Sequence, residues 1–99
     1  MDIKKANTAE GMELTIVGRL DIATSSWLLS TLTEALESSE TIVLDLAGVD
    51  YVSSAGLRVL LKAQKLAQQT SKSMKLKNIT PEAMEVFDIT GFTGILTII

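Results

Sequence analysis

The sequence of 99 residues contains no cysteine and no histidine. Without cysteine the chain can form no disulfide bond, no thiolate nucleophile and no sulfur-ligated zinc site. Without histidine it lacks the commonest general base and the commonest metal ligand. Both absences argue against an enzyme, and the remaining side chains predict neither a bound metal nor a cofactor.

Charge and hydropathy exclude two further classes of partner. Twelve acidic and nine basic residues give a net charge of −3 without a basic cluster, which argues against nucleic acid or an anionic membrane surface. No apolar run approaches the roughly 20 residues of a membrane span, and Met1–Lys5 lacks the apolar core of a signal peptide. The sequence therefore predicts a cytoplasmic protein that inserts into no membrane.

The pattern of apolar residues predicts one α/β domain over residues 1–99. Alternation or short apolar runs predict strands at Ile3–Ala9, Met12–Val17, Ile42–Leu46, Met74–Lys77 and Ile95–Ile99. Helical spacing predicts a helix capped by Ser25 or Ser26, another over Ala55–Gln69, and a third between Thr80 and Gly91. The order β-β-α-β-α-β-α-β, with right-handed crossovers, predicts a mixed sheet of four to five strands whose helices cover mainly one face.

Two neighbouring hydroxyls follow the apolar third strand, where open α/β sheets place their functional sites. Ser53 and Ser54 precede Ala55 and Gly56 at the start of the clearest helix. Either serine could simply cap that helix, and Gly56 could simply allow close packing of the helix on the sheet. A phosphate attached there would meet free backbone amides and the positive end of the helix dipole. The two roles are compatible.

A second polar segment, Gly18–Ser25, connects the second strand to the first helix. Asp21 within it could contact a partner or could order its own turn. The turn role is favoured because aspartate commonly accepts hydrogen bonds from nearby backbone amides.

Three segments together resemble the STAS domain of the anti-sigma-factor antagonist family. They are Gly18-Arg19-Leu20-Asp21, Tyr51-Val52-Ser53-Ser54-Ala55-Gly56-Leu57 and Phe87-Asp88-Ile89-Thr90-Gly91-Phe92. Each is weak alone, but their order and positions on the predicted elements are specific, and the resemblance covers essentially the whole chain.

The resemblance implies a partner switch. In this family the unphosphorylated antagonist binds an anti-sigma factor that is also a serine kinase of the GHKL type, and so releases its target. Phosphorylation of a serine in the second motif ends that association, and a PP2C-type phosphatase restores it. The motif aligns Ser54 with the phosphorylated serine, while Ser53 stands where many members have aspartate and is the second choice.

The resemblance also implies a partner surface made from both polar segments. The residues expected to form it are Asp21, Ile22, Ala23, Thr24, Ser25, Ser53, Ser54, Gly56, Leu57 and Arg58. Two matters stay open at this point. Family members usually continue into a C-terminal helix, for which the sequence has no counterpart. The same kind of domain also serves as an accessory module of transporters or lipid-transport complexes, where the serine need not be phosphorylated.

Overall fold

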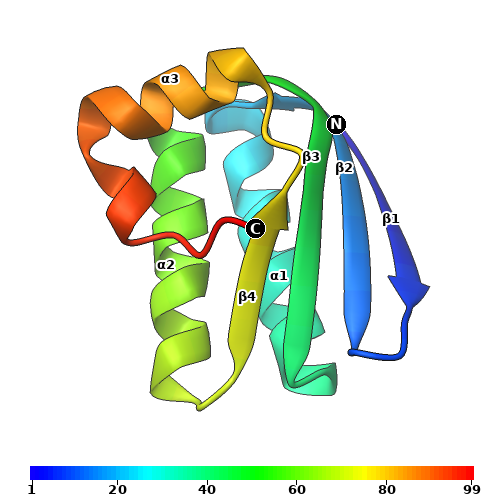
Figure 1. Ribbon diagram of the computed structural model, residues 1–99. Helices are drawn as coiled ribbons and strands as arrows, with labels where there is room; N and C mark the ends of the chain where they lie inside the picture. The colour runs from blue at the N-terminus through cyan, green and yellow to red at the C-terminus, as the bar shows by residue number, and fades with distance from the viewer.

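The computed structural model describes residues 1–99 and contains one sheet, three α-helices and one short 3-10 helix (Figure 1). The strands are β1 (Asp2–Asn7), β2 (Met12–Leu20), β3 (Thr41–Val52) and β4 (Ser73–Lys77). The helices are α1 (Ile22–Ser38), α2 (Ser54–Gln69), α3 (Pro81–Thr90) and the 3-10 helix η1 (Phe92–Gly94).

The four strands lie in the order β1-β2-β3-β4. The hairpin β1–β2 is antiparallel, whereas β2 with β3 and β3 with β4 are parallel. The predicted mixed sheet is confirmed, and so is the predicted order of the first seven helices and strands along the chain.

Helices α1 and α2 pack side by side on one face of the sheet (Figure 1). Alternate residues of the strands point toward them, so that Leu14, Ile16, Ile42 and Leu44 are completely buried. A single apolar cluster of 22 residues fills the space between the sheet and the helices. Helix α3 lies beside the end of β3 and extends over the beginning of α2 (Figure 1). None of the helices combines the length and hydropathy that a membrane span requires.

Strand β3 is much longer than its predicted apolar run, Ile42–Leu46, because its second half pairs with the end of β2. Arg19 pairs with Tyr51 and Leu20 with Val52. The segment before Ser53, which the sequence suggests is a loop, is therefore strand up to Val52.

The predicted final strand, Ile95–Ile99, is reduced to a single parallel bridge between Ile98 and Leu76 of β4. The Leu76 amide donates to the Thr97 carbonyl, and the Ile99 amide donates to the Leu76 carbonyl. The amides of Ile95 and Leu96 donate instead to the carbonyl of Phe92, at the turn that contains η1. The first two of the five residues in the predicted strand therefore form a turn.

Helix α3 begins and ends as its sequence predicts. The Thr80 hydroxyl accepts a hydrogen bond from the Ala83 amide at 3.3 Å, and Pro81 occupies the first helical position. Gly91 ends the helix in the left-handed conformation, with φ of 76°.

Gly56 allows the first turn of α2 to touch the end of β2. A Cβ atom at this position would lie 2.7 Å from the Leu20 carbonyl oxygen. We therefore expect Gly56→Ala to lower the free energy of unfolding by about 1–3 kcal/mol, as overpacking does elsewhere. Urea denaturation followed by circular dichroism measures this change.

Gly94→Ala is the matched control, because a Cβ atom there would meet nothing within 4 Å. Its stability should stay close to that of the wild type. Equal stability of the two variants would contradict a close contact between α2 and β2.

Candidate functional site

The parallel pairing of β2 and β3 places the two polar segments beside each other. Both strands end at the same edge of the sheet, and the Ser53 amide donates to the Leu20 carbonyl at 2.7 Å. Asp21 directly follows β2 and Ser53 directly follows β3. An open groove lined by Asp21, Ile22, Ala23, Tyr51 and Ser53 lies between the segments.

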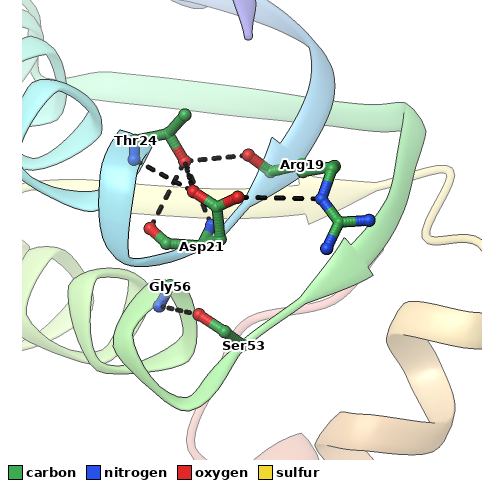
Figure 2. Close-up of polar contacts among 5 residues, drawn as sticks. All are labelled: Arg19, Asp21, Thr24, Ser53 and Gly56. Carbon is green, nitrogen blue, oxygen red and sulfur yellow. Dashed lines mark hydrogen bonds and ion pairs between the residues drawn. The ribbon is translucent and has the colours of Figure 1, made fainter.

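Asp21 caps helix α1 and forms a capping box with Thr24 (Figure 2). The Thr24 amide donates to Asp21 Oδ1 at 3.1 Å, and the Asp21 amide donates to Thr24 Oγ1 at 3.0 Å. The turn role favoured for Asp21 is therefore confirmed. The predicted caps Ser25 and Ser26 are wrong, because the helix begins four residues earlier than Ser26, at Ile22.

Arg19 connects Asp21 to Tyr51. Its guanidinium lies 4.1 Å from the centre of the Tyr51 ring, and its Nε is 3.6 Å from Asp21 Oδ2. Partial burial by itself raises the pKa of the Asp21 carboxyl, but hydrogen bonds from Thr24 and Ala23 and the charge of Arg19 outweigh it. The pKa of Asp21 is consequently held below its ordinary value.

The two neighbouring serines are in different environments. Ser53 is half-buried and caps α2, because its Oγ accepts a hydrogen bond from the Gly56 amide at 3.2 Å (Figure 2). Ser54 is the first residue of α2; it is exposed, and its hydroxyl makes no hydrogen bond. The capping role that was open between them thus belongs to Ser53.

The other residues expected at the partner surface divide into exposed and buried groups. Ile22 is 80% exposed, and Ala23 and Arg58 are exposed as well. Gly56 and Leu57 are buried, with Leu57 only 3% exposed. The Ser25 hydroxyl donates to the Ile22 carbonyl within the first turn of α1. Gly56 therefore lies beneath the surface of the site, which corrects the expectation for that residue, and Leu57 reaches the surface only as part of a groove wall.

A second groove beside Ser54 includes residues that the sequence did not place at the site. Ser54, Leu57 and Arg58 line it together with Leu61, Thr90 and Phe92. Thr90 and Phe92 belong to the third motif, whose position next to α2 depends on how α3 packs against the end of β3. The only sign in the sequence that these residues belong to the site was that their motif and the serine motif both match the same family resemblance.

Comparison with known proteins identifies the family of this arrangement. A family model described as "Mlab, STAS domain" matches residues 3–97. The chain belongs to the STAS domain family. The resemblance carried by the three motifs is thereby confirmed.

Relatives in sequence are anti-sigma factor antagonists. BtrV of Bordetella bronchiseptica is 37% identical over 82 residues, which cover 82% of this chain and 71% of BtrV. The anti-sigma-B factor antagonist of Bacillus subtilis is 28% identical over 98 residues, which cover 99% of this STAS domain and 88% of the relative.

A solved structure shares the fold. The anti-sigma factor antagonist SpoIIAA in its unphosphorylated form superimposes with a TM-score of 0.79 at 17% identity, covering 99% of this STAS domain and 88% of that chain. The phosphorylated form of the Bacillus protein SpoIIAA gives a TM-score of 0.74 at the same identity, covering 99% and 91% of the two chains.

Replacing each serine by alanine separates their roles. We expect Ser53→Ala to lower the free energy of unfolding by about 1 kcal/mol, because the Gly56 amide loses its acceptor. Ser54→Ala should leave stability unchanged within about 0.5 kcal/mol, because its hydroxyl has no partner and alanine favours a helix. Urea denaturation of both variants tests this, and the reverse order of stabilities would refute the assignment of the cap.

The lowered pKa of Asp21 predicts a pH dependence with a definite sign. Its carboxylate stabilises the fold above the unfolded pKa of about 3.9, and that contribution is lost as pH falls through the lower folded value. Asp21→Asn keeps a capping oxygen but cannot ionise. The wild type should therefore lose stability more steeply than Asp21→Asn below about pH 4, as measured by urea denaturation between pH 7 and 3.

Asp21→Ala serves as the comparison, since it removes the cap as well as the charge and should be destabilised over the entire pH range. If the free energy of unfolding changed with pH in the same way for the wild type and Asp21→Asn below pH 4, the lowered pKa of Asp21 would be contradicted.

Proposed function

We propose that this STAS domain is an anti-sigma factor antagonist that works by partner switching. Its unphosphorylated form binds an anti-sigma factor that is also a serine kinase of the GHKL type. Phosphorylation of Ser54 ends the complex, and a PP2C-type phosphatase restores binding. The observation that carries the proposal is the exposed, unbonded hydroxyl of Ser54 next to a serine already committed to capping.

A phosphate on Ser54 fits the fold without any rearrangement. Ser54 occupies the first position of α2, and the amides of the first helical turn have no carbonyl partners within the helix. Those amides and the positive end of the helix dipole favour an anion at this position. Ser53 keeps the helix capped in either state. The modification therefore changes the surface while the core is left as it is.

The same phosphate is unfavourable inside a complex. It adds about −1.5 to −2 charges and three acceptor oxygens at one exposed point. A partner that packs against Ser54, Arg58 and the Asp21–Ser25 segment would have to remove this dianion from water. Burial of a charge that the partner does not neutralise costs several kcal/mol, which reduces affinity by orders of magnitude.

The chain takes part in this cycle as a substrate and binding partner. Members of its family are regulatory proteins, and its site contains a hydroxyl without a neighbouring base. The kinase supplies ATP and the catalytic groups, and the phosphatase supplies the hydrolytic chemistry. The domain supplies a rigid surface with Ser54 accessible on it; neither nucleic acid nor a membrane takes part.

Phosphorylation of the intact chain tests the assignment of the site. Incubation with its cognate anti-sigma factor and ATP should add one phosphate, located on Ser54 by tandem mass spectrometry. Ser53→Ala should still be phosphorylated and Ser54→Ala should not. Modification of Ser53 instead would overturn the choice of serine. Absence of phosphate from both would favour an unmodified accessory module of a transporter or lipid-transport complex.

Binding to the same kinase tests the role of the charge. We expect Ser54→Ala to bind with the affinity of the wild type and Ser54→Asp to bind at least tenfold more weakly, as measured by isothermal titration calorimetry. Equal affinities of these two variants would rule out exclusion by charge.

A further inference from the structure

Helix α2 presents a row of positive charges that begins beside Ser54. Arg58, Lys62 and Lys65 are exposed and follow each other at helical spacing. At about 100° per residue, Ser54 and these three residues fall within an arc of about 80°. We call Arg58, Lys62 and Lys65 the basic row.

The basic row differs in charge from the rest of the molecule. Helix α2 contains no acidic residue and carries a charge of +3. Since the whole chain carries −3, the other residues together carry −6. No other helix is basic: α1 holds Glu34 and Glu37, and α3 holds Glu82, Glu85 and Asp88.

The three side chains of the basic row form no ion pair with an acidic side chain. The two ion pairs of the molecule, Arg19 with Asp21 and Lys77 with Glu13, lie on the strands and at the start of α1. Neither includes a member of the basic row. Positive charges without intramolecular partners raise the local concentration of anionic groups and accelerate association with them.

Two of the three side chains of the basic row, Arg58 and Lys62, border grooves. Arg58 and Lys62 rim a groove between α1 and α2 whose other walls include Ser25, Ser26 and Leu29. Arg58 also rims the groove that contains Ser54, Leu61 and Phe92. A segment lying along α2 would therefore contact Arg58 and Lys62 in partly desolvated surroundings, where electrostatic interactions are stronger than on a convex surface.

We propose that the basic row docks an acidic segment of the kinase, which lies along α2 with its carboxylates facing Arg58, Lys62 and Lys65. This inference rests on the proposed function, since it describes the partner of the same surface. Complementary charge and continuity with the Ser54 surface both favour this occupant over a neutral or basic one.

The position of Ser54 at the head of the basic row explains how one phosphate ends binding. The phosphate places a dianion where the acidic segment of the partner begins, so the two repel each other. Arg58 lies one turn further along α2 and can pair with the phosphate, as oppositely charged residues four apart do on helices. Phosphorylation thus adds a repulsive charge and removes an attractive one.

Charge reversal on α2 tests the proposal. The probe is the purified kinase that phosphorylates Ser54, added to the unphosphorylated chain in stopped-flow association experiments at several salt concentrations. We expect Lys62→Glu/Lys65→Glu to lower the association rate constant about tenfold or more and to reduce its dependence on salt. The association rate constant of Lys62→Gln/Lys65→Gln should lie between those of the charge-reversed variant and the wild type.

Lys4→Glu/Lys5→Glu is the matched control, because it changes net charge equally on two exposed residues of the edge strand β1. Its association rate should stay within about twofold of the wild type. Equal association rate constants for the wild type and Lys62→Glu/Lys65→Glu would overturn the proposal. An equal decrease of the rate constant in Lys62→Glu/Lys65→Glu and in the control would overturn it as well. Failure of the partner switch itself has a different signature, because the wild type would then neither bind the kinase nor accept a phosphate.

Discussion

The parallel pairing between the ends of β2 and β3 is the interaction on which the whole site depends. It sets Leu20 beside Val52, so that the next residue of one strand, Asp21, caps α1 and the next residue of the other, Ser53, caps α2. The hydrogen bond from the Ser53 amide to the Leu20 carbonyl extends this pairing by one step. Gly56 then allows α2 to sit directly against Leu20. If the register shifted by one residue, the two helix starts would separate and the core residues of the strand would face outward.

Ser53 and Ser54 are adjacent but differ in their relation to α2. A capping hydroxyl is engaged by the helix that it caps, whereas a hydroxyl at the first helical position is not. Here Ser53 holds the helix while Ser54 projects from it. The exposed hydroxyl and the capping hydroxyl thus lie on adjacent residues. Aspartate at position 53 would be equally compatible with the fold, because serine and aspartate are both good caps.

Most of the secondary structure could be predicted because it depends on local periodicity. The apolar spacing in Ala55–Gln69 and the Thr80-Pro81 start were sufficient for two helices. The cap of α1 was missed because the capping box of Asp21 and Thr24 lies before the apolar spacing begins, and two other errors arose where distant residues decide the structure. Strand β3 continues to Val52 because β2 lies beside it, which apolar content alone does not reveal. Ile95–Ile99 is apolar enough for a strand, but a turn takes up its first amides. The motif containing Phe92 could be found, but its place beside Ser54 depends on the tertiary fold.

The contacts of Arg19 have a consequence for the energetics of recognition. This side chain is stacked on Tyr51 and tied to Asp21, whose own rotamer is fixed by the capping box. Long side chains ordinarily lose about 0.5–1.5 kcal/mol of rotational freedom each when a partner immobilises them. For Arg19, part of that loss has already occurred during folding. A partner that contacts this end of the sheet therefore removes less side-chain entropy there than it would from an arginine without these contacts.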